Sequence, residues 1–241
     1  MRISVVVPAF NEERLIAGTL AAIEPGLDAF RRRCWEVERI VCDNNSTDAT
    51  AAIARAAGAT VVFEPVNQIA RARNRGAEAA TGDWIVFIDA DTHPPAALFE
   101  DVAAAIESGR CIAGGATIRL DGHYPRAAAI TAGWNWVSRT ARWFAGSFVF
   151  CDAKAFREAG GFSARLFAGE EIDLSRRLKP IARRAGREIL ILHRHPVVTS
   201  ARKIHLYSTR EHLTFLARTV LGGGRTLTNR EACHTWYDGR R

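Results

Sequence analysis

The sequence predicts an α/β fold in which a mostly parallel central sheet is flanked by helices. Short apolar segments alternate with helical segments over residues 3–91, a pattern that implies right-handed crossovers between parallel strands. Polar motifs follow three of the predicted strands, and ligands of such sheets bind beyond the carboxyl ends of the strands. The chain has 241 residues, 48% of them hydrophobic, which suits one globular domain with its own core.

The first half of the chain alternates regularly between the two kinds of element. β-branched residues favour strands, whereas apolar residues at helical spacing favour helices. Pro25-Gly26 is expected to end the first helix and Gly58 the second. The strands are expected at residues 3–7, 37–42, 60–63 and 84–88, and the helices at residues 12–23, 49–57 and 69–80.

The second half is less regular, and Pro180 is expected to break one of its helices. No repeat or compositional break divides the chain, so we expect one domain over residues 1–221, with halves meeting at residue 92, and a basic tail at 222–241. Helices are expected at residues 94–108, 130–148, 170–178 and 204–221, and strands at residues 111–120, 148–151, 189–192 and 197–198.

The charge balance indicates anionic partners. Lys and Arg number 33 against 26 Asp and Glu, which gives a net charge of +7. Nucleotide phosphates, nucleic acid and an acidic membrane surface all fit such an excess. Acidic motifs at the expected ligand edge argue against nucleic acid, which requires a basic face with exposed aromatic residues.

The five cysteines and the hydropathy pattern bear on the compartment. Their odd number and the lack of a CxxC spacing argue against a disulfide framework or structural zinc, so we expect a cytoplasmic protein. No segment has the features of a signal peptide or an 18-residue apolar run. Peripheral membrane contact and homo-oligomerisation stay open.

Two acidic motifs are candidates for chemistry. Asp89-Ala90-Asp91 follows a buried strand, where two carboxylates could hold Mg²⁺ or Mn²⁺ or simply cap a loop. Glu170-Glu171-Ile172-Asp173 begins a predicted helix. Its acids could serve the helix macrodipole, or one of them could take a proton from a hydroxyl nucleophile.

Taken together, these motifs resemble those of the inverting glycosyltransferases of family 2, which have the GT-A fold, a Rossmann-like architecture. The resemblance spans residues 1–180 in the family's order. The segments that carry it are Val5–Glu13, Val41–Asp48, Ala72–Gly76, Ala80–Asp83, Phe87–Asp91, Gly160–Phe162 and Gly169–Leu174 with Arg177 and Leu178. The second segment has Asp43-Asn44 where many members have two acids.

The resemblance implies roles for individual residues. Residues 1–92 would form the nucleotide-sugar half and residues 93–221 the smaller acceptor half. Glu171 would be the general base, with Glu170 and Asp173 on the acceptor side, and Asp91 would bind the metal ion together with His205. The expected nucleotide-sugar contacts are Pro8, Asn11, Glu12, Asp43, Arg73, Asp89, Ala90 and Asp91.

The resulting hypothesis is a metal-dependent inverting glycosyltransferase with Mg²⁺ or Mn²⁺ as cofactor. It would move a sugar from a nucleotide-sugar donor, with a UDP-sugar favoured, to the hydroxyl of an unknown acceptor. The alternative is a non-catalytic nucleotide-binding or polyanion-binding protein on the same scaffold. A nucleotidyltransferase is less favoured because residues 8–13 contain no glycine for a phosphate loop.

Overall fold

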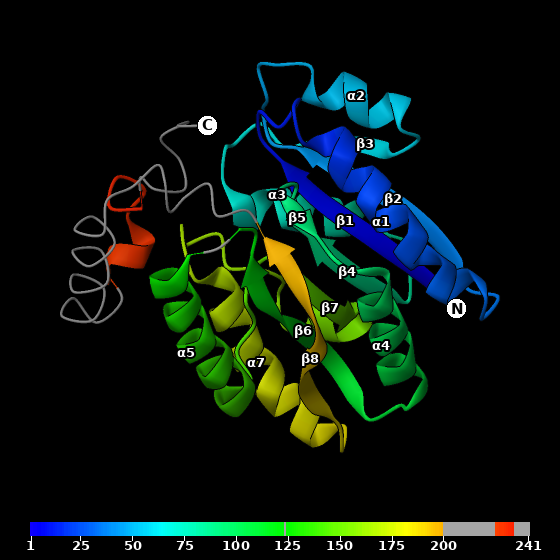
Figure 1. Ribbon diagram of the computed structural model, residues 1–241, viewed down its shortest axis with the longest axis vertical. Coiled ribbons are helices and arrows are strands. Elements are labelled where there is room, and N and C mark those ends of the chain that lie inside the picture. Colours follow the sequence, from blue (N-terminus) through cyan, green and yellow to red (C-terminus); the bar gives the residue numbers. More distant parts are fainter. Residues whose placement is uncertain (123, 200–224, 234–241) are drawn as a thin grey trace.

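One sheet of eight strands runs through both halves of the chain in the computed structural model (Figure 1). The structure describes residues 1–122, 124–199 and 225–233. The strands are β1 (Arg2–Ala9), β2 (Glu36–Asp43), β3 (Thr60–Phe63), β4 (Trp84–Ile88), β5 (Thr92–His93), β6 (Cys111–Leu120), β7 (Phe148–Asp152) and β8 (Glu188–Thr199). The helices are α1 (Ile16–Arg31), α2 (Thr50–Ala56), α3 (Ile69–Ala79), α4 (Ala96–Glu107), α5 (Pro125–Ala141), α6 (Ala153–Glu158) and α7 (Glu170–Arg184), with a 3₁₀ turn, η1 (Arg225–Thr228).

The strand order is β3-β2-β1-β4-β7-β6-β8-β5. β1 pairs in parallel with β2 and β4, and β2 pairs in parallel with β3. β7 is antiparallel to β4 and β6, whereas β6 and β8 are parallel. The predicted α/β class with a mostly parallel sheet is therefore confirmed, and β7 is the strand that joins the second half to the first.

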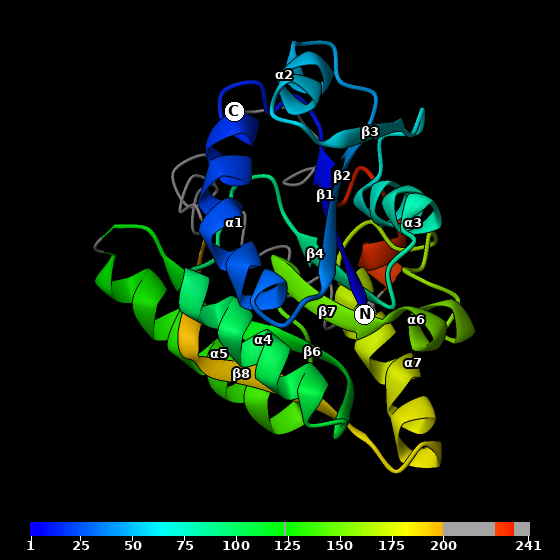
Figure 2. The same ribbon diagram turned by 90° about the vertical axis from the view of Figure 1, so that its right-hand side faces the viewer.

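Two apolar clusters cover the two faces of the sheet. Val5 and Val7 of β1 face the cluster that includes α1 and α4, whereas Val6 faces the cluster that includes α3, α6 and α7. This alternation is the side-chain period of a strand. Figure 2 shows α1 and α4 on one side of the sheet and α3, α6 and α7 on the other.

Proline does not end either helix in which the sequence predicted that it would. α1 continues through Pro25 to Arg31, and α7 continues through Pro180 to Arg184. Both prolines are exposed, so water can satisfy the carbonyls that lose a partner, while Leu27 and Phe30 beyond Pro25 are fully buried. Burial of the next turn outweighs the lost hydrogen bond.

Gly26 allows a close approach between helices rather than a stop. A Cβ atom at Gly26 would lie 2.2 Å from the ring of Phe99 in α4. The glycine therefore lets α1 and α4 pack directly against each other.

Other boundaries in the second half also differ from the prediction. The two short strands expected near residues 189–198 form the single strand β8. α5 ends at Ala141 rather than at residue 148. Phe144 and Phe148 lie beyond the helix, where both are buried, and Phe148 begins β7. α6 and β5 were not predicted. The helix expected at residues 204–221 lies outside the described residues, as does most of the tail.

None of the helices in the described ranges is both long and apolar enough to span a bilayer.

Candidate active site

The ends of β1 and β2 bring the first two polar motifs together. Ala9 pairs with Asp43 in the parallel register, and Pro8 pairs with Cys42. Asn11, which has a left-handed backbone (φ 52°), accepts a hydrogen bond from the Thr47 amide at 2.8 Å and donates its own amide to Ser46 Oγ at 3.0 Å. The two loops after these strands therefore form one connected unit.

Buried acids line the same unit. Asp43 is 7% exposed, and its carboxylate accepts a hydrogen bond from the Ser46 amide at 3.0 Å. Glu12 is also buried, and its amide donates to Thr50 Oγ1 at 2.8 Å. Thr19 Oγ1 donates to the Ala90 carbonyl at 2.5 Å, which connects α1 to the acidic motif after β4. The predicted donor residues thus gather at one edge of the sheet.

Asn44 has a structural task that the sequence did not reveal. Its Nδ2 donates to the carbonyls of Glu64 and Val66, and its Oδ1 accepts from the Gln68 amide at 2.9 Å, just before α3 begins. Gln68 Nε2 in turn donates to two carbonyls in residues 164–166, at 2.9 Å each. A carboxylate in place of the Asn44 amide could not donate these bonds.

Arg73 of α3 joins the first half of the chain to the second. It is 1% exposed, and its Nη1 donates to Glu170 Oε1 at 2.6 Å. Its Nη2 donates to Asp89 Oδ1 at 2.7 Å and to the Gly146 carbonyl at 2.8 Å. The guanidinium also lies 5.1 Å from the centre of the Phe162 ring, within the range of a cation–π contact. Glu170 and Asp89 are thereby fixed by one buried cation.

The electrostatics of this cluster favour protonation of Glu171. Burial opposes the charge on Arg73, but the carboxylates of Asp89, Glu170 and Glu171 outweigh it and raise the pKa of Arg73. Glu171 is partly buried. Burial and then the Glu170 carboxylate raise its pKa to about 8, against the opposing effect of Arg73. A carboxyl group of this kind is a weak acid and a correspondingly better proton acceptor.

Gly146 marks the place where the Glu171 side chain ends. A Cβ atom built on Gly146 would lie 3.3 Å from the Glu171 carboxyl carbon and 3.5 Å from Arg73 Nη2. The same Cβ atom would lie 3.3 Å from Glu171 Oε1, so both of these short contacts involve the carboxyl group. The absence of a side chain at Gly146 therefore leaves room for Glu171 beside Arg73.

The loop before α7 is held by a second set of polar contacts. Asn74 donates to the Phe162 carbonyl and accepts from the Phe162 amide, at 2.8 and 2.9 Å. Arg177 donates to the Gly161 carbonyl at 2.8 Å and pairs with Asp173 at 2.7 Å. Gly169, at the start of α7, has a left-handed backbone (φ 72°). Asp173 thus pairs with Arg177, which binds this loop.

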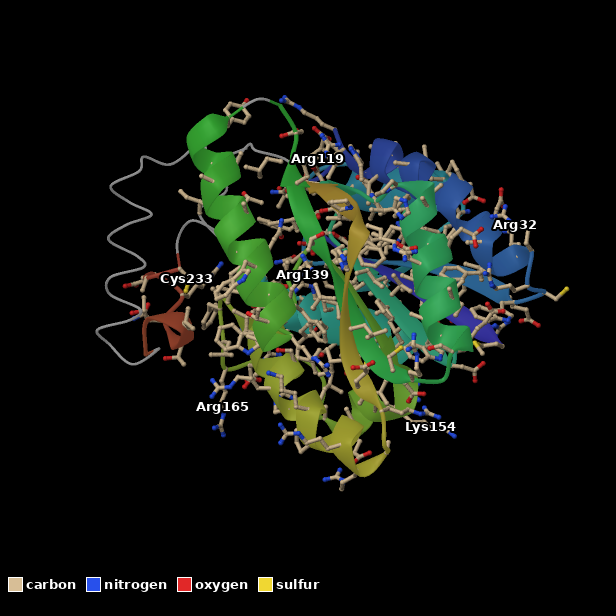
Figure 3. All side chains as sticks on the ribbon, turned by 60° about the horizontal axis from the view of Figure 1, so that its bottom comes forward. Arg32, Arg119, Arg139, Lys154, Arg165 and Cys233 are labelled. Atoms are coloured by element: carbon tan, nitrogen blue, oxygen red, sulfur yellow. The ribbon has the colours of Figure 1, made fainter. Side chains whose placement is uncertain are left out.

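Residues 225–233 pack against the start of α7, which the sequence did not predict. The Phe167 amide donates to the Leu227 carbonyl at 2.7 Å, and Leu227 lies 3.6 Å from a Cβ atom built on Gly169. Cys233 is buried, and burial followed by the Glu170 carboxylate raises its pKa to about 11. Figure 3 shows Cys233 on this segment. Only hydropathy at Leu227 could have signalled the contact.

The donor set fits a hard cation only in part. Over the described ranges, no group of three or more His, Cys, Asp or Glu residues could hold a metal ion. Mg²⁺ and related ions, however, are commonly held by one or two carboxylates plus substrate phosphates, and Asp91 follows β4 at the edge where the donor motifs meet. His205 lies outside the described residues. His195 of β8 pairs with Asp101 of α4 at 2.9 Å, away from the acidic motif after β4.

A parallel half that ends in an acidic motif is joined through an antiparallel strand to a helix that begins with acids, and this arrangement is that of the GT-A fold. Solved structures support this fold. A mannosyltransferase from Pyrobaculum calidifontis in complex with GDP-Man and Mn²⁺ has a TM-score of 0.66 and 22% identity, covering 96% of this chain and 64% of that chain. Glucosyl-3-phosphoglycerate synthase from Mycobacterium tuberculosis has a TM-score of 0.62 and 22% identity, covering 96% and 78%.

Residues 4–164 match the model of glycosyl transferase family 2, and the chain belongs to this family. An uncharacterized glycosyltransferase of M. tuberculosis is 35% identical over 140 residues, which are 57% of this chain and 60% of that relative. Glucosyl-3-phosphoglycerate synthase of the same species is 40% identical over 105 residues, 40% of this chain and 31% of that protein. The match therefore spans less than two thirds of the length of each relative. The family that the sequence predicted is therefore confirmed.

Proposed function

We propose that this enzyme transfers a sugar from a nucleotide-sugar donor to an acceptor hydroxyl, with inversion at the anomeric carbon and Glu171 as the general base. The observation that carries the proposal is the position of Glu171. Its carboxyl group lies at Gly146 beside the buried Arg73, which also holds Asp89 on the donor side. A base next to the donor motif is what a single displacement requires.

The donor would lie along the loops after β1, β2 and β4. Its proposed contacts are Pro8, Asn11, Glu12, Asp43, Asp89, Ala90 and Asp91. Arg73 is too deeply buried, at 1% exposed, to serve mainly as a donor ligand. We therefore propose that it is a positioning residue, which holds Asp89 and Glu170 in place. A UDP-sugar is the favoured donor.

Mg²⁺ or Mn²⁺ is the proposed cofactor, held by Asp91 with diphosphate oxygens and with His205 as a further candidate ligand. When bound, such an ion neutralises charge on the departing diphosphate. Similar solved structures contain Mn²⁺ together with GDP-Man or with UDP and phosphoglyceric acid. Their nucleotides and metal ion support the choice of ligands to test here.

The proposed step begins with a proton transfer. Glu171 accepts the proton of the acceptor hydroxyl while the hydroxyl oxygen forms a bond to the anomeric carbon. The bond from that carbon to the nucleoside diphosphate breaks on the opposite face, and the diphosphate leaves with the bonding electrons. Because the pKa of Glu171 is raised to about 8, the deprotonated carboxylate is a stronger base than an ordinary glutamate.

Phosphoglyceric acid is the first acceptor to test. A relative that is 40% identical over 105 residues is a glucosyl-3-phosphoglycerate synthase. The solved structure of such a synthase from M. tuberculosis with phosphoglyceric acid is 25% identical to this chain and covers 94% of this chain. These likenesses make a small phosphorylated acid a reasoned starting point for the acceptor.

A donor panel tests the proposal. UDP-, GDP- and dTDP-sugars would be assayed for binding, hydrolysis and transfer with Mn²⁺ or Mg²⁺, and again after EDTA. We expect one nucleotide to be selected and its turnover to be lost with EDTA. Folded protein that binds none of the donors would overturn the proposal, and the alternative of a polyanion-binding scaffold would then be tested.

A further inference from the structure

A basic hollow lies between the ends of α5 and α7 and the start of β8. Its volume is about 270 Å³. Four cationic residues line it, Arg142, Lys179, Arg183 and Arg187, with Glu188 as the acid among them. Figure 1 shows α7 running from the sheet edge that carries the active site toward the end where β8 begins.

The cations of this hollow are poorly compensated. Glu188 is already paired with Arg142 at 2.9 Å. Neither Arg183 nor Arg187 forms an ion pair with any residue in the described part of the chain. By contrast, Arg33 on the opposite side of the sheet pairs with two glutamates. A hollow with three more cations than acids concentrates positive potential.

Lys179, which lines the hollow, is also surrounded by an excess of positive charge. It is partly buried, and its Nζ donates to the Ala141 carbonyl at 2.6 Å. Burial lowers the pKa of Lys179, and the nearby Arg176, Arg183 and Arg142 lower it further. An anion in the hollow would relieve this repulsion. Cations at a helix C-terminus also stabilise the macrodipole, but that effect needs no hollow between two helices and a strand.

We propose that this hollow binds a phosphate group, carried either by a small phosphorylated molecule or by the headgroup of an anionic lipid. Arginine and lysine side chains are the usual protein ligands of phosphate.

The hollow is separate from the active site, because Glu171 and Arg183 lie on the same helix, roughly 18 Å apart at the rise of an α-helix. Trp136, which is 69% exposed, lies one turn before Thr140 at the hollow and suits a lipid interface.

Titration of the 241-residue chain with pyrophosphate in EDTA tests this site. Arg183→Ala/Arg187→Ala should weaken binding about tenfold or more, because two charged donors are lost. The matched control is Lys154→Ala/Arg157→Ala on α6, which removes the same charge from exposed residues that do not line the hollow. Figure 3 shows Lys154 well apart from Arg139, which lies in the last turn of α5 next to the hollow. Thermal unfolding would verify that each variant is folded.

Sedimentation with vesicles distinguishes the two sources of phosphate. Phosphatidylglycerol vesicles that bind the native chain but not Arg183→Ala/Arg187→Ala, with phosphatidylcholine vesicles inert, would assign a lipid headgroup. Pyrophosphate binding with the same dependence and no vesicle binding would assign a small phosphorylated ligand. Equal losses in the Lys154→Ala/Arg157→Ala control, or no saturable binding of either probe, would overturn the proposal.

Discussion

Replacing Glu171 by glutamine should stabilise the fold at alkaline pH while it removes the proposed base. The pKa of Glu171 rises from 4.5 to about 8 in the folded chain, so the native state binds one more proton than the unfolded state between these values. Stability therefore falls as the pH rises through this window. At 1.36 kcal/mol for each pH step, the loss is about 3 kcal/mol at pH 7 and up to about 5 kcal/mol above pH 8.

Glutamine keeps the shape of Glu171 but carries no charge, so this pH-dependent loss should disappear in the variant. Urea unfolding of the native chain and Glu171→Gln at about pH 5, 7 and 9 measures the gap between them. We expect a small difference at pH 5 that widens to several kcal/mol at pH 9, in favour of the variant. Transfer by the native enzyme should rise with pH toward about 8 and be largely lost in the variant.

Asp173→Asn provides the matched control, since it makes the same chemical change two residues along α7. Asp173 is paired with Arg177 at 2.7 Å, so its replacement should destabilise the chain slightly, without a gap that grows toward pH 9. A Glu171→Gln variant whose stability tracks that of the native chain at every pH would refute the electrostatic account of this site.

Three further substitutions probe the surroundings of the base. Arg73→Lys should lower the free energy of unfolding by about 3–5 kcal/mol in urea titrations, because an ammonium group cannot reproduce the fork that holds two carboxylates; a loss below about 1 kcal/mol would contradict this. Gly146→Ala should reduce kcat by about tenfold or more with little change in melting temperature, since its Cβ would lie 3.3 Å from Glu171; unchanged kcat would show that this space is not needed. Asn44→Asp should cost about 1–3 kcal/mol in thermal unfolding, because the carbonyls within residues 64–66 lose their donor; an equally stable variant would remove Asn44 from the support of α3.

The first half of the fold could be predicted because its evidence is local. Strand and helix periodicities over residues 3–88 are visible within each segment, and parallel pairing follows from their alternation. The second half depends on pairings that no local pattern contains, such as Trp84 of β4 opposite Asp152 of β7. Pro25 and Pro180 misled the prediction because their exposure, which makes them tolerable within a helix, is a tertiary property.

The candidate site divides in the same way. Glu171 and the acidic motif at residues 89–91 stand out in the sequence because acids follow apolar segments or begin a helix. Gly146 carries no such signal, since its contacts with Arg73 and Glu171 arise only in the folded chain. The sequence placed Arg73 near the donor, but its bond to Glu170 joins residues 97 positions apart, which only the folded chain can reveal.

The shared contact of Arg73 with Asp89 and Glu170 also limits how this enzyme could be recombined. A chimera that takes residues 1–92 from this chain and an acceptor half from another family member would bring in the donor-side arginine without its acceptor-side acid, unless the incoming segment supplies an equivalent carboxylate. The buried guanidinium would then face an unmatched partner, at a cost of several kcal/mol. The two halves can therefore be exchanged only when the incoming half supplies a carboxylate in the place of Glu170.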